Sequence, residues 1–513
     1  MLTRLQPRAL LPFLMAAAFA ASAALAAAPS ACSATGSPDL TVRAPAAVDG
    51  YLRSLADEPF DLRVACAKWA GSFSRRHQAF ALRKPSGAAT APRFILFPGG
   101  DLDIRRLASW LSRNSAIGNL ERARDFVVAE FDRSVTTARL RETLDAQQIG
   151  YFEPDCDGPD FLSTSLDIMR PLDASHDCWQ RAARPSFPND PCMDELWGHA
   201  KIGWDSGVAE RSVPRVVAVL DSGIDARHAD LAMNVVRRIG LNEPRHSQGS
   251  LLNSRCATSG LCYPHGTEMA GTIGGRMNNG IGVVGVAPHS RLVPIVISQV
   301  DRGLLARLST IAEGIDAAAQ ANVDVINISA KWPVDSRAIS RAIRRAVAGA
   351  AEGKRLIVTG YTTSLDSDDS VREYYPSRYR CLAGVISAVP ADMRGHDLFN
   401  PAGPPDETDG RIQAPGVDIV VTTSENSEQS YALSEAAGPS SAAAYVSGAV
   451  ALVWGSPPLD QCGAQEIKRL LFCRSKGSDS SRYPWINVDF LRELGKIDAG
   501  ASCRSAMESL GCN

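Results

Sequence analysis

The sequence has no excess of either charge, no internal repeat and no glycine-rich nucleotide-binding motif. Lys and Arg together number 54 and Asp and Glu 56, so the formal net charge is -2. Such a balance provides no electrostatic footprint for nucleic acid or for an anionic membrane surface. The missing repeat and glycine motifs give no support to a solenoid or a nucleotide-dependent enzyme.

Long apolar runs are also scarce, and the one that is present lies at the N-terminus. Two arginines precede an apolar run over residues 9–25, and the first acidic residue is Asp39. Small residues around Ala26 complete a signal-peptidase site. A membrane anchor, the alternative, would need a longer and more strongly apolar run. We therefore expect residues 1–27 to be a signal peptide, and the protein to be secreted, periplasmic or extracellular, with no membrane partner after cleavage.

The remaining chain divides by its pattern, and its 513 residues suggest about three units at roughly 150 residues each. Residues 28–92 carry little periodic signal, and we expect a low-information extension there. Residues 93–155 alternate short strands and helices, which predicts a small α+β unit. Residues 156–187 contain several prolines and are expected to be a linker. Residues 188–513 alternate β-branched strands with amphipathic helices, which predicts an α/β domain with a mostly parallel sheet and a Cys-containing C-terminal extension.

Three segments place a reactive side chain in a suitable backbone context. Asp221 ends an apolar strand and meets a glycine turn, and the carboxyl ends of strands are where α/β sheets form sites. His265 opens a helix of small residues. Ser440 opens a strongly apolar helix, where backbone N–H groups and the helix dipole favour negative charge. Each residue taken alone also has a structural explanation, as a turn aspartate, a core histidine or an N-cap serine.

Chain order decides which hydrolase these residues can form. An α/β-hydrolase requires its histidine after the serine, but no histidine follows His396. A zinc protease requires a second histidine near His265, which is absent. The order Asp221, His265, Ser440 remains, in which the histidine takes the serine proton and the aspartate holds the imidazole tautomer.

The segments VAVLDSGID, HGTEMAG and GPSSAAAYVSGAVAL resemble the three active-site segments of the subtilisin-like serine proteases. The resemblance covers about residues 188–456. It implies a doubly wound sheet, a catalytic triad of Asp221, His265 and Ser440, and an inhibitory propeptide at residues 93–155.

By this resemblance we expect a secreted serine endopeptidase that acts through a Ser acyl-enzyme and is made as a zymogen. Its partners would be a protein or peptide substrate and its own propeptide as intramolecular inhibitor, and we expect a monomer. The alternative is a catalytically weak or inactive subtilase scaffold that acts as a binding or regulatory protein.

Tyr361 and the long connector over residues 155–191 motivate that alternative, and a separate departure from the family pattern concerns the substrate pocket. At the position of the oxyanion-hole asparagine the chain has Tyr361, whose hydroxyl is the candidate replacement donor. The substrate-binding segment reads Ser329, Ala330, Lys331 and then Trp332, with bulky side chains where the family has glycines. These side chains are expected to narrow or charge the pocket.

The resemblance requires no cofactor for the chemistry, but it implies a structural Ca²⁺ site. Hard oxygen ligands suit this ion. The alternative is an Asn-Asn-Gly turn that binds no metal. The implied ligands are Asp230, Met277, Asn279, Ile281 and Val283.

The cysteines offer a further expectation about processing. Four of the twelve precede Pro188 and eight follow it, so cleavage near Pro188 would leave an even number in each part. Within the second part we expect cysteines that are close in sequence to pair. These pairs are Cys256 with Cys262, Cys462 with Cys473, and Cys503 with Cys512.

Overall fold

The structure is a computed structural model of the chain. Within the residues that it describes, no helix combines the length and apolar character needed to cross a bilayer. The predicted signal peptide, residues 1–27, lies outside them, as do Cys256 and Cys262. The described residues are 43–55, 58–71, 91–156, 169–171, 178–236, 264–297, 306–348, 355–365, 371–397, 410–423, 430–434, 438–475, 483–498 and 500–512.

A six-stranded parallel sheet forms the centre of the larger domain. Its strands run in the order β13-β12-β9-β8-β6-β7. Short, mostly apolar segments rich in β-branched residues form such doubly covered strands because both faces are buried. The bounds are β6 Val216–Asp221, β7 Arg291–Val296, β8 Val325–Ile328, β9 Leu356–Gly360, β12 Val385–Ala391 and β13 Arg411–Pro415.

Helices cover both faces of this sheet, which confirms the predicted doubly wound fold. Alternate residues of β6 enter different cores: Val217 and Val219 pack with α8 (His265–Gly274) and α11 (Pro439–Trp454). Ala218 and Leu220 pack on the other side, with α9 (Leu308–Gln320) and α10 (Arg337–Ala348). Side chains of a strand point alternately to opposite faces, so one apolar run supplies two cores.

Smaller elements surround the sheet. β5 (Met169–Pro171) adds to the hairpin of β14 (Ile419–Thr423) and β15 (Ser430–Ser434), and β10 (Thr363–Leu365) pairs with β11 (Val371–Glu373). The other helices of this part are α6 Trp197–Lys201, α7 Ser206–Arg211, α12 Ala464–Arg474 and α13 Cys503–Ser509, and the 3₁₀ helices are Cys178–Gln180, Met193–Glu195, Ser377–Tyr379, Leu459–Gln461 and Asp489–Lys496.

The N-terminal unit is an antiparallel sheet covered by helices. Its strands β1 (Arg93–Pro98), β2 (Ile117–Arg122), β3 (Val127–Phe131) and β4 (Ile149–Pro154) lie in the order β2-β3-β1-β4. Helices α4 (Ile104–Leu111) and α5 (Thr137–Leu144) connect them.

This unit begins earlier than residue 93, inside the range 28–92 that we expected to carry little structural signal. Helices α1 (Ala46–Ser54) and α2 (Leu62–Ala70) belong to it, because Val48 and Leu52 are buried in the same core as Phe94. Each helix has two buried residues, too few to stand out as a periodic pattern: Val48 and Leu52 in α1, and Leu62 and Ala65 in α2.

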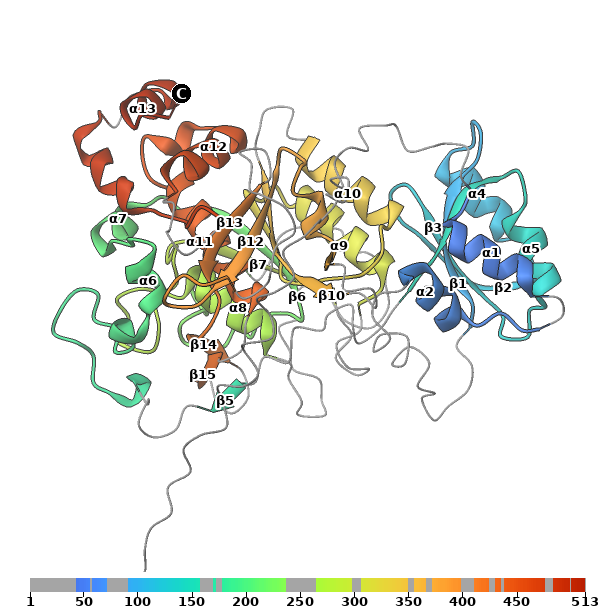
Figure 1. Cartoon of the computed structure of the whole chain (residues 1–513), viewed down its shortest axis with the longest axis horizontal. Helices are drawn as coiled ribbons and strands as arrows, with labels where there is room; N and C mark the ends of the chain where they lie inside the picture. The colour runs from blue at the N-terminus through green and yellow to red at the C-terminus, as the bar shows by residue number, and fades with distance from the viewer. Residues whose placement is uncertain are drawn as a thin grey trace, which may run out of the picture.

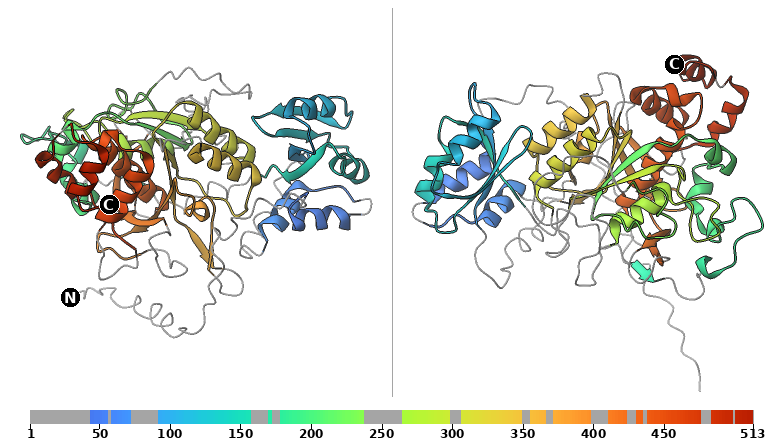
Figure 2. Two further views of the ribbon diagram at one scale, coloured as in Figure 1. Left: turned by 90° about the horizontal axis from the view of Figure 1, so that it is seen from above. Right: turned by 180° about the vertical axis from the view of Figure 1, so that it is seen from behind.

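The N-terminal unit sits at one end of the molecule, against α9 and α10, while α12 and α13 lie at the opposite end (Figure 1). The two further views agree on this arrangement (Figure 2). Apolar side chains from β1 and β3 join the core cluster that contains α9 and α10. The two units therefore share a buried surface.

The disulfides differ from the expected pairing. Cys462 bonds Cys503, and Cys473 bonds Cys512. Cys462 precedes helix α12 and Cys473 lies in its last turn, so at 1.5 Å per residue the helix holds them well beyond the roughly 7 Å that a disulfide tolerates. Cys178 bonds Cys192, so a disulfide crosses Pro188 and the cysteines do not divide there into two closed sets.

Candidate active site

Asp221 and His265 form a buried, hydrogen-bonded pair. Nδ1 of His265 lies 2.8 Å from Oδ1 and 2.9 Å from Oδ2 of Asp221. Asp221 is the last residue of β6, and His265 is the first residue of α8. The Asp221 carboxylate also accepts a hydrogen bond from the backbone N–H of Ser222 at 2.7 Å. Both side chains are 4% exposed, so the pair is shielded from water.

A glycine lets the two elements approach so closely. A Cβ atom at Gly266 would lie 2.1 Å from the carbonyl oxygen of Gly223 and 3.1 Å from Cβ of Asp221. Any side chain at this position would push α8 away from the end of β6. The Gly after the histidine in the motif thus has a packing reason.

Ser440 occupies the first turn of α11, which is buried along its whole length. The N–H groups of that turn have no partner within the helix and carry the positive end of its dipole. Helices α8 and α11 pack against each other on the same face of the sheet, each with its reactive residue in its first turn.

A buried chain of hydrogen bonds holds the segment beside Ser440. The Ser440 hydroxyl donates to the carbonyl of Ser329 at 3.4 Å, and the Ser329 hydroxyl donates to the carbonyl of Ser440 at 3.3 Å. Asn327 donates to Ser329 at 2.9 Å and accepts from the hydroxyl of Ser447 at 3.0 Å. Asn327 and Ser447 were not among the predicted site residues, and only their places on β8 and α11 mark them.

Sheet topology explains why residues so far apart in sequence meet. The chain order reverses between β6 and β8, because β7 lies on one side of β6 and β8 on the other. Asp221 ends β6 and Ser329 follows β8, so both lie at the carboxyl edge of this switch point. Sites of open α/β sheets form at that position.

Tyr361 follows β9, but its side chain has a different environment from the one predicted. It is fully buried in a cluster with Val389 and Tyr483, and its hydroxyl accepts a hydrogen bond from Nη1 of Arg411 at 3.4 Å. The Arg411 guanidinium also lies 5.4 Å from the centre of the Tyr361 ring. Arg411 lies 50 residues after Tyr361, so the segment around Tyr361 does not reveal this cation. Because the Arg411 guanidinium interacts with both the ring and the hydroxyl of Tyr361, the structure gives no support to Tyr361 as an oxyanion donor.

The predicted substrate-binding residues follow β8, and the first of them lies beside Ser440. Ser329 contacts Ser440 directly, and Ala330 is 7% exposed. Lys331 places its ammonium 5.2 Å from the centre of the Tyr374 ring. The following residue, Trp332, exchanges two backbone hydrogen bonds of 2.9 Å with Tyr375. Trp332 and Tyr375 are buried in the core that contains α9 and α10, so of this segment it is Ser329 that contacts Ser440.

Two buried carboxylates lie against the implied metal loop, residues 277–283. Asp230 accepts hydrogen bonds from Asn279 Nδ2 at 2.8 Å, from the Val283 N–H at 3.0 Å and from the Tyr431 hydroxyl at 2.9 Å. Burial, together with the charge of Asp190, raises the pKa of Asp230 to about 7.

Asp190 was not predicted from the sequence, and it lies against the same loop. It is fully buried and accepts from the N–H groups of Asn278 at 2.7 Å and Asn279 at 3.2 Å. Two buried carboxylates beside a loop rich in carbonyl oxygens fit a hard divalent cation, which would offset their mutual repulsion. Its ligands would come from Asp190, Asp230, Asn279 and the backbone of Met277, Ile281 and Val283.

Comparison with known proteins identifies relatives for the larger domain. The profile of the Subtilase family matches residues 215–481. Subtilisin from Bacillus pumilus is 32% identical over 244 residues, which cover 47% of this chain and 77% of that protein. Subtilisin E from Bacillus subtilis (strain 168) is 32% identical over 244 residues, and the chain spans 56% of that relative's length.

A solved structure shows a similar fold. Fervidolysin from Fervidobacterium pennivorans matches with a TM-score of 0.54 at 20% sequence identity. The match covers 80% of this chain and 62% of that chain. At this identity the likeness concerns the fold alone.

Proposed function

The chain belongs to the subtilase family of serine endopeptidases, and from this premise we propose that it is a secreted endopeptidase made as a zymogen. It hydrolyses peptide bonds through an acyl-enzyme at Ser440. The observation that carries the proposal is the buried pair of Asp221 and His265 at the switch point of the sheet. Ser440, in the first turn of α11, contacts Ser329 at the same edge.

The geometry supports a division of labour within the triad. With Nδ1 of His265 donating to Asp221, the other ring nitrogen takes the Ser440 proton as the serine oxygen attacks the peptide carbonyl. His265 then delivers this proton to the leaving amine. A water molecule then takes the place of the leaving amine. His265 removes a proton from this water, which attacks the acyl-enzyme and releases the second product. Asp221 holds the ring and stabilises the imidazolium.

The oxyanion of the intermediate is stabilised by the N-terminal end of α11. The N–H of Ser440 lies in the first turn, where no intrahelical acceptor competes for it. The positive end of the helix dipole adds to this stabilisation. It lowers the barrier because the negative charge on the oxygen develops only on the way to the transition state.

Labelling with a fluorophosphonate tests the catalytic proposal. We expect the wild type to be labelled and Ser440→Ala to remain unlabelled. Ser441→Ala is the matched control, since it removes the neighbouring hydroxyl from the same helix turn and should keep the label. Equal labelling of the wild type and Ser440→Ala would refute a nucleophilic Ser440.

The zymogen proposal is supported by the way the N-terminal unit meets α9 and α10. Asp155 accepts hydrogen bonds from the backbone N–H and the hydroxyl of Ser309, at 3.0 and 2.8 Å, in the first turn of α9. Glu153 accepts from the hydroxyl of Ser336 at 2.7 Å and from the N–H groups of Arg337 and Ala338 at 2.9 and 3.2 Å. Two adjacent carboxylates thus cap two helices of the catalytic domain.

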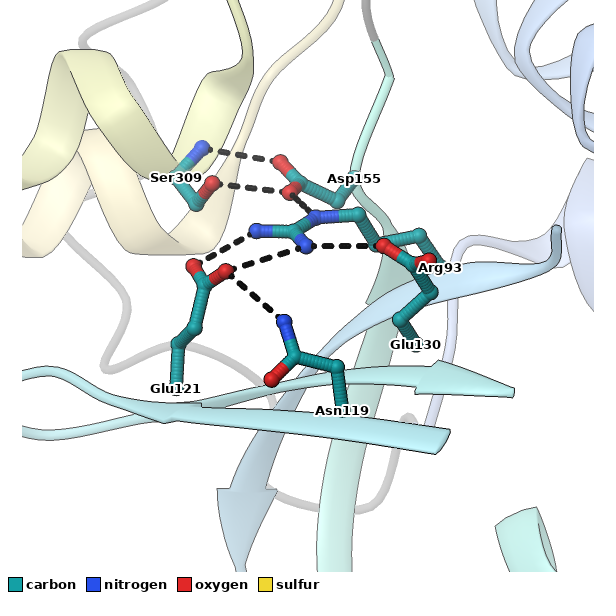
Figure 3. A network of polar contacts seen from close by, with 6 residues as sticks. All are labelled: Arg93, Asn119, Glu121, Glu130, Asp155 and Ser309. Carbon is teal, nitrogen blue, oxygen red and sulfur yellow. Dashed lines mark hydrogen bonds and ion pairs between the residues drawn. The ribbon is translucent and has the colours of Figure 1, made fainter. Parts of the chain in front are cut away.

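Arg93 ties this contact into the N-terminal unit (Figure 3). Its guanidinium bonds Asp155 at 2.7 Å, Glu121 at 2.7 Å and Glu130 at 3.2 Å. Side-chain exposure is 6% for Arg93 and 0% for Asp155, so the ion pair is shielded from solvent. The sheet and the helix cap are therefore one connected polar network.

We also propose that residues 277–283, together with Asp190 and Asp230, bind a structural Ca²⁺. The two buried carboxylates and the Asn279 side chain support it. When bound, the ion supplies charge neutralisation to the loop and takes no part in peptide hydrolysis.

Secretion is proposed from the apolar N-terminal run and is supported by the disulfides of the described domains. N-terminal sequencing of the recovered protein tests it, and a product that keeps residues 1–27 would contradict a cleaved leader.

A second candidate function is a subtilase scaffold with little turnover. The observation that favours it is the contact of the Tyr361 hydroxyl with Arg411, which leaves the second oxyanion donor unassigned. A purified, processed protein that takes the fluorophosphonate label but shows no caseinolytic activity would favour this alternative.

A further inference from the structure

We propose that residues 169–171 and 178–187, here called the strap, stay on the catalytic domain when the propeptide is cut away. The cut then lies between Cys156 and Met169 rather than at Pro188, where the sequence predicted the catalytic domain to begin. This inference rests on the proposed zymogen and assigns the boundary between its two parts.

A disulfide fastens the strap to the catalytic domain. Cys178 bonds Cys192, fourteen residues later and beyond Pro188. Both sulfurs are buried in the core cluster that also contains α8 and α11. A cut at Pro188 would leave residue 178 covalently attached to residue 192. Such a cut does not separate the preceding chain from the catalytic domain.

The rest of the strap follows the surface of the same domain. Arg181 pairs with Glu195 at 2.7 Å and Arg184 with Asp194 at 3.0 Å. The N–H of Arg184 donates to the carbonyl of Asn189 at 2.7 Å. Exposed ion pairs of this kind add little stability by themselves, so the disulfide is the main anchor.

β5 anchors the start of the strap. Met169, Arg170 and Pro171 pair with Ser434, Leu433 and Ala432 of β15 in antiparallel register. β15 also carries Tyr431, whose hydroxyl donates to Asp230 of the candidate metal loop. The strand pairing places the strap on the edge of a sheet that supports this loop.

The chain before this point belongs to the other unit. Cys156 bonds Cys66 of α2, and its neighbour Asp155 bonds Arg93 of β1. A cut after Cys156 and before Met169 breaks neither described disulfide that flanks it. Hydrolysis there adds one water across the peptide bond, with a new carboxylate on the N-terminal unit and a new amino group on the strap.

The direct test is the N-terminus of the processed wild-type protein after reduction and alkylation. We expect a catalytic fragment that starts between residues 157 and 169 and contains the whole strap. A fragment that starts at or after Pro188, or that has lost residues 169–187, would overturn the inference.

A second measurement tests whether the strap is part of the catalytic fold without depending on the protein's own proteolytic activity. In the full-length Ser440→Ala chain, which cannot process itself, we compare the melting temperature with that of Ser440→Ala carrying Cys178→Ser and Cys192→Ser. Loss of a buried disulfide that closes a short loop should lower Tm by roughly 5 °C. An unchanged Tm would overturn the strap as a fixed part of the domain. A wild type that is never cut contradicts the zymogen proposal, and this comparison still decides whether the strap belongs to the catalytic fold.

Discussion

The hydroxyl of Ser336 donates a 2.7 Å hydrogen bond to the carboxylate of Glu153, although 183 residues separate them in sequence. Ser336 precedes α10, and its hydroxyl also accepts from the N–H of Ile339 at 3.3 Å. Glu153 extends this cap from the neighbouring unit. The first turn of α10 is therefore completed by a side chain that processing would detach.

The Glu153 cap should make the docked state depend on pH. Burial outweighs the hydrogen bonds from Ser336, Arg337 and Ala338 and raises the pKa of Glu153 from 4.5 to about 7. The protonated form is favoured on docking, so stability is fully present below pH 4.5 and is lost as the pH rises through 7. The rise in pKa corresponds to on the order of 3 kcal/mol.

Chemical unfolding of the full-length Ser440→Ala chain between pH 4.5 and 8 measures this contribution. Glu153→Gln should flatten the pH dependence, and Glu142→Gln, which alters a side chain 68% exposed, should leave it intact. A Glu153→Gln profile parallel to that of the parent would show that Glu153 does not titrate in this range.

Replacing Arg93 should destabilise the contact between the two units. Arg93→Met removes the cation that pairs with the buried Asp155. No positive charge then separates the Asp155 carboxylate from those of Glu121 and Glu130. Breaking a buried ion pair costs about 3–5 kcal/mol. Urea unfolding in the Ser440→Ala background measures the loss. Glu130→Gln is the matched control, because this partner is 39% exposed and should cost less than about 1 kcal/mol. Equal effects of the two variants would argue against a buried network.

Removing the Tyr361 hydroxyl should leave catalysis largely intact. Because the hydroxyl accepts from Arg411, Tyr361→Phe should cost about 1 kcal/mol of stability and less than tenfold in kcat. Removing one oxyanion donor from subtilisin costs roughly 10²–10³ in turnover. Peptide-substrate kinetics with matched unfolding curves distinguish the two. A loss of a hundredfold or more with unchanged stability would return Tyr361 to the oxyanion hole.

Calcium should raise the melting temperature by binding between the loop of residues 277–283 and the carboxylates of Asp190 and Asp230. Binding at one hundred times Kd stabilises a folded protein by about 2.7 kcal/mol, or several degrees in a protein of this size. Asp190→Asn should reduce the difference between Ca²⁺ and EDTA, whereas Asp194→Asn, whose side chain is 69% exposed, should preserve it. A wild type with the same Tm in Ca²⁺ and EDTA would contradict a calcium site.

Much of the active site could be read from short segments. Asp221 and His265 lie in motifs whose local pattern already predicts a strand end and a helix start, and the structure pairs them. Their order with Ser440 was enough to exclude an α/β-hydrolase. Tyr361 shows the limit, because its position after β9 was predictable but its contact with Arg411 was not. That contact depends on how β9 and β13 are brought together around β12.

The sequence by itself determined the family and most strands of the parallel sheet, because strand runs and motif order are properties of neighbouring residues. It did not reveal helices α1 and α2. Tertiary structure alone decided which distant groups meet. It placed Glu153 and Asp155 on the ends of α10 and α9, and it joined Cys178 to Cys192. The physical reason is that hydrogen bonds and disulfides require contact within a few ångströms, and only the packed chain sets those distances.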